Sequence, residues 1–417
     1  MVKALSNFHV VNLGCKVNKV ESDSYASLCL SAGLEETPLE SAHLVVVNTC
    51  AVTGEAEKKT RTTVRHVCSC NSQGIILVTG CSAALHASVY EEMSPRVKVV
   101  AKALTTDYLK GLLEEKFGSA KLPESVIAPV GEGFRTRVGV KVQDGCDNAC
   151  TYCIVHVARG KATSRDAQEI IDEVRKYDAL GVKELVLTGI NLGSYRNQVD
   201  GHCLDLAGLL SILLDITNHL ESNEPDMRFR VGSIEPMDIS DSFVELMAAS
   251  NGRICRHLHL PLQSGSTKVL REMNRPYTAE DFLALVDKLR KAAPSLSLST
   301  DIIVGFPGET EEEFQETCQL ARQCAFSKIH VFPYSLRRGT TAALRSDQID
   351  ASVKSARASE LRKLGNALAL QDKMNRAGTQ ELALVESDGT WMTESYHSVD
   401  AQDEATVGSL VPYFFTK

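Results

Sequence analysis

The sequence lacks any long apolar run. Its 417 residues contain no window that approaches the roughly 20 apolar residues needed to span a bilayer. The first stretch, MVKALSNFHVVNLGC, also lacks the positive segment and apolar core of a secretory signal. Hydrophobic residues make up 43% of the chain, which is enough for a sizeable buried core. We therefore expect a soluble, cytoplasmic protein without a membrane attachment.

An excess of positive charge is also missing. Lys and Arg number 45 against 53 Asp and Glu, which gives a formal net charge of −8. Any contact with nucleic acid therefore needs a local basic patch. Two stretches are candidates, Lys58 to His66 and Arg253 to Arg275. Such a stretch is either a solvated surface or a set of phosphate contacts.

The thirteen cysteines are an odd number, and this argues against a disulfide framework and for reduced thiols. Three of them, Cys146, Cys150 and Cys153, have C-x3-C-x2-C spacing within KVQDGCDNACTYCIVHVARGK, and the next cysteine is Cys203. Because a four-iron cluster normally takes four Cys ligands, this loop predicts a cluster with one iron open to a non-protein ligand. A zinc site completed by His156, a ferredoxin-type cluster and buried structural cysteines remain alternatives.

Three further cysteines each follow a short apolar run near the N-terminus. The runs at 8–13, 43–48 and 74–79 read as buried strands, and Cys15, Cys50 and Cys81 come just after them. Helix-like stretches between the strands predict a small parallel sheet. Since strand ends gather at one edge of such a sheet, we expect these three cysteines to share a metal site.

After the Cys146 loop, strands and helices alternate. Counting the strand before the loop, six strands are expected, and this pattern predicts a parallel, barrel-like sheet with functional groups on the loops after the strands. Those loops are rich in Gly and polar residues. Within them we predict cofactor contacts from the side chains of Glu235 and Gln263 and from the backbone at Gly189 and Gly305.

Together with Tyr152, the C-x3-C-x2-C spacing resembles the radical S-adenosylmethionine (SAM) superfamily. The resemblance implies a [4Fe–4S] cluster whose open iron is chelated by the amino and carboxylate groups of SAM. One electron, from a donor such as flavodoxin or ferredoxin, then cleaves SAM to a deoxyadenosyl radical.

A narrower resemblance rests on VNLGCKVNKVESD, VVNTCAVT and VTGCSA, which are similar to the N-terminal domain of the methylthiotransferases, a branch of that superfamily. The resemblance implies that Cys15, Cys50 and Cys81 bind a second [4Fe–4S] cluster, which carries or donates sulfur. The implied fold is α/β: a small parallel domain at 1–121, a partial (β/α)6 radical SAM barrel at 132–354, and a linker helix with a small TRAM-like β-barrel at 355–417.

Within the methylthiotransferases, GCKVN, NTCAVT, TYCIV and LTGIN most resemble the group that acts on threonylcarbamoyladenosine (t6A) of tRNA. The implied product is the 2-methylthio derivative of this anticodon-loop adenosine. Relatives that modify isopentenyladenosine of tRNA or an aspartate of a ribosomal protein are alternatives, as is a non-enzymatic two-cluster redox protein. The chain departs from the family's pattern at His156, where Pro is expected, and in its acidic tail.

Overall fold

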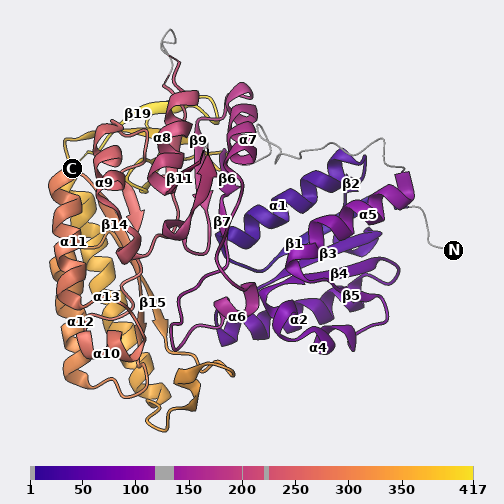
Figure 1. Ribbon diagram of the computed structural model, residues 1–417, viewed down its shortest axis with the longest axis horizontal. Coiled ribbons are helices and arrows are strands. Elements are labelled where there is room, and N and C mark those ends of the chain that lie inside the picture. The colour runs from indigo at the N-terminus through magenta and orange to yellow at the C-terminus, as the bar shows by residue number, and fades with distance from the viewer. Residues whose placement is uncertain (1–4, 118–135, 200, 220–224, 417) are drawn as a thin grey trace. The chain divides into compact units, whose positions relative to one another are not determined.

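The computed structural model describes residues 5–117, 136–199, 201–219 and 225–416 (Figure 1). Within these residues the chain forms two compact units. The first comprises residues 5–117 with 145–147 and 153–161, and the second comprises 136–144, 148–152 and 162–416. In the described part of the chain, no helix is both long enough and apolar enough to cross a membrane.

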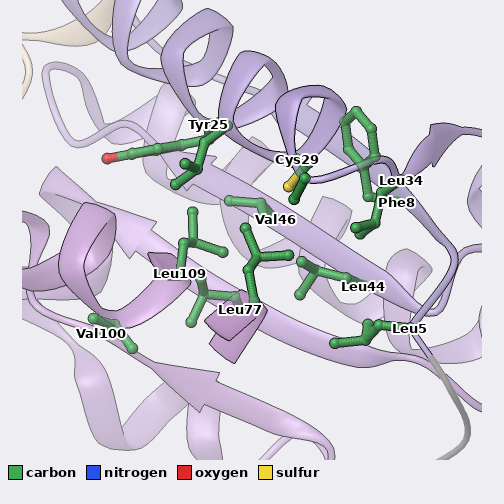
Figure 2. Close-up of a cluster of buried hydrophobic side chains, with 13 residues drawn as sticks. Leu5, Phe8, Tyr25, Cys29, Leu34, Leu44, Val46, Leu77, Val100 and Leu109 are labelled. Atoms are coloured by element: carbon green, nitrogen blue, oxygen red, sulfur yellow. The ribbon is translucent and has the colours of Figure 1, made fainter. Parts of the chain in front are cut away.

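The first unit is a five-stranded parallel sheet with the order β2-β1-β3-β4-β5. Side chains of β3 alternate between two cores. Leu44 and Val46 lie in the core under α1 and α5 (Figure 2), whereas Val45 and Val47 pack against α2. The elements are β1 Asn7–Asn12, α1 Lys16–Ser31, β2 Glu35–Glu36, β3 Leu44–Thr49, α2 Gly54–Cys70, β4 Ile75–Gly80, α3 Cys81–Leu85, α4 Ala87–Glu91, β5 Val97–Val99 and α5 Thr105–Phe117.

The second unit contains the predicted six-stranded parallel sheet. Its strands form the neighbouring sets β12-β9-β6 and β13-β14-β15, and single parallel bridges from Phe229 to Ile254 and from Ser233 to His259 join the two sets. The barrel strands are β6 Arg137–Lys141, β9 Glu184–Thr188, β12 Arg228–Val231, β13 His257–His259, β14 Ser297–Val304 and β15 Lys328–Pro333.

Helices and two small hairpins complete this barrel. The helices are α7 Ala167–Ala179, α8 Leu206–Ile216, α9 Asp241–Ala249, α10 Thr267–Glu272, α11 Ala279–Ala292 and α12 Glu311–Cys324. The short helix α6 (Val155–Arg159) belongs to the first unit. The hairpins pair β7 (Gln143–Asp144) with β8 (Thr163–Ser164) and β10 (Asn197–Val199) with β11 (His202–Leu204).

The C-terminal segment packs onto the barrel within the second unit. The helix α13 (Ala351–Asn375) leads to a four-stranded antiparallel sheet with the order β18-β17-β16-β19. These strands are β16 Gln380–Val385, β17 Thr390–Thr393, β18 Ser398–Asp400 and β19 Leu410–Phe414. The predicted domain boundary at residue 355 falls inside α13, and the predicted boundary between the first two domains, from 121 to 132, lies outside the described residues.

Buried charge fixes this sheet to the barrel. Arg228 and Arg230 both pair with Glu184, and their remaining N–H groups donate to four main-chain carbonyls of the C-terminal sheet. The two arginines hold the pKa of Glu184 down at about 2 although burial alone raises it. Because Glu184 and Arg228 begin their strands, the sheet covers the end of the barrel opposite the functional loops.

Candidate functional site

The three cysteines of the first unit lie directly after neighbouring strands. Cys15 precedes α1, Cys50 follows β3, and Cys81 is the first residue of α3. Burial raises the pKa of the Cys50 thiol, and the Cys15 and Cys81 thiols raise it further. The three cysteines therefore gather at one edge of the sheet, whereas their role as cluster ligands stays a prediction.

A buried pair of asparagines holds the loops that carry these cysteines. Asn18 Nδ2 donates to Asn48 Oδ1 at 2.8 Å and to Thr49 O at 3.0 Å, and Asn48 Nδ2 donates back to Asn18 O at 2.9 Å. Asn18 Oδ1 also accepts from Cys15 Sγ at 3.3 Å. Gly80 has a φ of +93°, and a Cβ there would lie 2.5 Å from Asn48 Oδ1. The turn into Cys81 therefore requires glycine.

Arg159 is a functional candidate that the sequence did not reveal. It ends α6, which packs on α3 through Ile154 and Ala158. Its Nε donates to Cys81 Sγ at 3.2 Å and its Nη2 donates to Asn18 Oδ1 at 2.8 Å. The Arg159 side chain is only 1% exposed. In the sequence it looks like any surface arginine, and its place six residues after Cys153 is the only signal.

The donor set fits an iron–sulfur cluster better than a single metal ion. One zinc ion with Zn–S bonds of about 2.3 Å would hold its thiolates about 3.8 Å apart. Among the described residues, the set of three metal-ligand atoms lying within 4.8 Å of one another is His259, Asp301 and His330 rather than the thiols. A four-iron cluster, in which each thiolate binds a different iron, accommodates the wider spacing.

The loop with the second cysteine trio begins at a strained turn. Gly145 has a φ of +68°, and a Cβ there would lie 1.9 Å from Lys161 O, so glycine is required. In the first unit, Cys146 N donates to Gly160 O at 3.1 Å, and Cys153 Sγ accepts from Val155 N at 3.3 Å.

His156, which replaces the expected Pro, lies in this part of the loop. Its Nδ1 is buried and has no hydrogen-bond partner among the described residues.

In the second unit, Cys150 lies beside a buried ion pair. Arg275 Nη1 donates to Cys150 Sγ at 3.4 Å, and the same guanidinium forms two hydrogen bonds with the Glu235 carboxylate. The loop is tied to the barrel by Thr151 N, which donates to Met273 O at 3.1 Å. The predicted residue Glu235 therefore positions an arginine that contacts a predicted cluster ligand.

The other predicted cofactor contacts lie at strand ends, as expected. Gln263 has a φ of +67°, and its N–H donates to Asp301 O at 2.8 Å. At Gly189 a Cβ would lie 2.9 Å from Gln143 Oε1. Gly305 has a φ of +70°, and a Cβ there would lie 2.1 Å from Lys354 Cγ, so close packing of α13 already explains this glycine. Contact of these residues with a cofactor stays a prediction.

A polar group lies on the adjacent strands β13, β14 and β15. His259 Nε2 lies 3.3 Å from Asp301 Oδ1, and the His259 and His330 rings are 5.8 Å apart. Ser299 Oγ hydrogen-bonds His259 Nδ1 at 2.9 Å, which fixes the orientation of this ring. His259, Asp301 and His330 are only partly buried, and can therefore hydrogen-bond a polar ligand or hold a metal ion.

The expectation that Arg253 to Arg275 forms a phosphate-binding patch is wrong for its two ends. Arg275 is buried against Glu235, and Arg253 donates to the main-chain oxygens of Leu214, Thr217 and Met227. A guanidinium that satisfies internal carbonyls is not available to a polyanion. By contrast, Lys58, Lys59 and Arg65 of the stretch at 58–66 are exposed on α2.

Models of two protein families match the two parts of the chain that carry the cysteine trios. A model of the Radical SAM superfamily matches residues 140–321, and a model described as Uncharacterized protein family UPF0004 matches residues 7–102. A relative from Bacillus subtilis, "Threonylcarbamoyladenosine tRNA methylthiotransferase MtaB", is 39% identical over 376 residues, which are 87% of this chain and 80% of that protein. The chain belongs to the radical SAM methylthiotransferase family. As a member of this family it is an enzyme that uses SAM and a [4Fe–4S] cluster.

Other methylthiotransferases are similar at slightly lower identity. A relative from Carboxydothermus hydrogenoformans, "tRNA-2-methylthio-N(6)-dimethylallyladenosine synthase", is 34% identical over 400 residues, or 92% of this chain and 88% of that protein. Among solved structures, the radical SAM methyltransferase TsrM from Kitasatospora setae aligns with a TM-score of 0.58 at 15% identity, covering 81% of this chain and 77% of that one. This structural likeness supports the fold of the methylthiotransferase and nothing narrower.

Proposed function

We propose that this methylthiotransferase converts t6A, the modified adenosine next to the anticodon of tRNA, to its 2-methylthio derivative. In this proposal Cys146, Cys150 and Cys153 hold the SAM-binding [4Fe–4S] cluster. A second [4Fe–4S] cluster binds to Cys15, Cys50 and Cys81. The observation that supports the second cluster best is that the three cysteines follow neighbouring strands, with Cys15 and Cys81 joined through the hydrogen bonds of Asn18 and Arg159.

The choice of t6A rests on the relatives. Three proteins named threonylcarbamoyladenosine tRNA methylthiotransferases are 39%, 35% and 35% identical to this chain. Proteins named for dimethylallyladenosine are 31% to 35% identical, and this makes dimethylallyladenosine the second candidate substrate. A ribosomal-protein aspartate has no comparable support, and membership of an enzyme family opposes a purely redox role.

When bound, the clusters and SAM supply the radical and sulfur chemistry that side chains cannot provide. The chain's own residues position these groups. Arg275 orients Cys150 through its hydrogen bond to the sulfur, and Glu235 holds that guanidinium in place. Tyr152 packs against Phe306 and Tyr334 in an apolar cluster, which keeps water from that side of the loop. A small electron-transfer protein such as flavodoxin or ferredoxin would deliver the electron.

The exposed cations of α2 are the proposed contacts to tRNA phosphates. Lys58, Lys59 and Arg65 lie on one helix, and each neutralised phosphate adds to the salt dependence of binding. The C-terminal sheet is a poor second site, because from Asn366 onward the chain has three Lys or Arg against eight Asp or Glu. We therefore place the main electrostatic contact with tRNA on the first unit.

Nucleoside mass spectrometry tests the substrate. Cells that lack the gene should lose 2-methylthio-t6A and regain it with the parent chain. Variants with Ala at Cys15, Cys50 and Cys81, or at Cys146, Cys150 and Cys153, should not restore it. Retention of 2-methylthio-t6A together with loss of the 2-methylthio dimethylallyl product would transfer the assignment to the second candidate.

Iron counting on the purified chain tests the two sites separately. Each triple Ala variant should lose about four irons per chain. Only the variant at Cys146, Cys150 and Cys153 should also lose reductive cleavage of SAM to deoxyadenosine. Cys203→Ala is the matched control, because this exposed thiol lies in neither trio and its loss should leave the iron content unchanged. A full iron content in the Cys15, Cys50 and Cys81 variant would refute the second cluster.

A further inference from the structure

We propose that Arg159 sets the reduction potential of the cluster on Cys15, Cys50 and Cys81, by holding a positive charge and an N–H donor against the Cys81 sulfur. This inference rests on the second cluster of the proposed function. It assigns a role to a residue from the chain segment that carries the SAM-cluster cysteines. All the contacts that support it lie within the first unit.

The guanidinium of Arg159 is held in one orientation by three partners. Nε donates to Cys81 Sγ at 3.2 Å, Nη2 to Asn18 Oδ1 at 2.8 Å and Nη1 to Glu21 Oε1 at 3.3 Å. The planar guanidinium group of arginine can donate to three acceptors in fixed directions, whereas the flexible ammonium group of lysine cannot. Asn18 also accepts from Cys15, so this network touches two of the three thiols.

Arg159 shares a carboxylate partner with a second cation. Glu21 pairs with the Arg159 guanidinium and also with Lys102 Nζ at 2.7 Å. The positive charge of Arg159 therefore lies beside the thiols together with that of Lys102. The Arg159 and Glu21 side chains are 1% and 7% exposed, so water screens their charges little.

A positive charge and an N–H···S hydrogen bond both favour the reduced cluster. Reduction adds one negative charge to an already anionic centre, and the potential of such centres follows net charge, hydrogen bonds to sulfur and solvent exposure. A thiolate sulfur bound to iron still accepts a hydrogen bond. Loss of Arg159 should therefore make the N-terminal cluster harder to reduce.

Arg159 is close in the sequence to the cysteine trio of the proposed SAM-binding cluster. Cys153 and Arg159 are six residues apart, and α6 joins them. The segment that carries Cys153, the proposed third ligand of the SAM-binding cluster, thus ends at Arg159, which contacts Cys81 of the proposed N-terminal cluster. Arg159 is accordingly a positioning residue that acts through Cys81.

The test is a redox titration of the full-length chain carrying both clusters, followed by electron paramagnetic resonance. Added SAM perturbs the signal of the SAM-binding cluster and so identifies the other signal. In Arg159→Met, the ratio of reduced to oxidised N-terminal cluster at a fixed potential should fall about tenfold, or about 59 mV for one electron. Arg159→Lys keeps the charge and should recover part of this loss. Lys98→Met removes an exposed cation of the same unit that lies in neither proposed site, and this control should leave the potential unchanged.

Other results would overturn the proposal in distinguishable ways. Full iron content with an unchanged potential in Arg159→Met would mean that Arg159 does not tune the cluster. If Arg159→Met loses the cluster, the potential is read from Arg159→Lys, and an unchanged value there would leave Arg159 a purely structural role. About four irons in the parent chain would instead refute the second cluster, and with it this inference.

Discussion

The two cysteine sites both place a buried guanidinium against a sulfur, but they balance its charge differently. Arg159 and Arg275 are each 1% exposed, and each also pairs with a glutamate. Glu21, the partner of Arg159, binds a second cation, Lys102, whereas Glu235 has Arg275 as its only ion-pair partner within the described residues. Two trios of cysteines are thus distinguished by the charges around them.

This difference has consequences for stability as well as for redox behaviour. An anion with a second cation nearby survives the loss of the first, but an anion with a single partner is left uncompensated. Removal of Arg159 and removal of Arg275 should therefore lower the free energy of unfolding by different amounts.

The largest effect is expected for Arg275→Met. Removing this guanidinium leaves the carboxylate of Glu235 half-buried without a cation, which typically costs about 3–5 kcal/mol. The measurement is urea unfolding of the metal-free chain, followed through the transition of the second unit. The double variant Arg275→Met with Glu235→Gln removes the orphaned charge and should recover most of the loss. A loss below about 1 kcal/mol in the single variant would contradict the comparison.

A smaller effect is expected for Arg159→Met. Glu21 keeps its pair with Lys102, so the cost is the loss of hydrogen bonds to Asn18 and Cys81, about 1–3 kcal/mol. The same unfolding experiment measures it in the transition of the first unit. If the loss equalled that of Arg275→Met, Lys102 would not compensate Glu21, and the contrast between the sites would fail.

The smallest effect is the coupling between Arg159 and Lys102. Lys102→Met alone should cost less than about 1 kcal/mol, because Arg159 still pairs with Glu21. The double variant should lose about 1 kcal/mol more than the sum of the single variants, since it removes both Arg159 and Lys102 from Glu21. A double-mutant cycle of unfolding free energies checks this. Additive losses would show that the two cations act independently.

The longer strands of both parallel sheets, and the place of the cysteines just after the strands of the first sheet, could be predicted from the sequence because they rest on local patterns. Apolar runs such as LVVVN mark the strands, and Cys50 directly follows one of them. The edge strands β2 and β5 were missed because they are two and three residues long and carry little hydrophobic pattern. A short edge strand forms because it pairs with a neighbouring strand, and this pairing cannot be seen in the local sequence.

The two arginines could not be predicted for a related reason. Arg275 was grouped with nearby basic residues as a candidate phosphate contact, and Arg159 was not distinguished at all. Their roles depend on Glu235 and Glu21, which are distant in the sequence, 40 and 138 residues away. The local sequence around a buried arginine looks the same as that around an exposed one, and only the folded structure distinguishes them.

The attachment of the C-terminal sheet suggests how this region can diverge. Arg228 and Arg230 donate hydrogen bonds to main-chain oxygens of β16, of β17 and of the residue that follows β17. Every amino acid has a main-chain oxygen, so these hydrogen bonds tolerate almost any side-chain replacement in the strands that accept them. Tails of opposite charge are thus interchangeable in principle, and a basic tail transplanted from a relative should seat on the same two arginines.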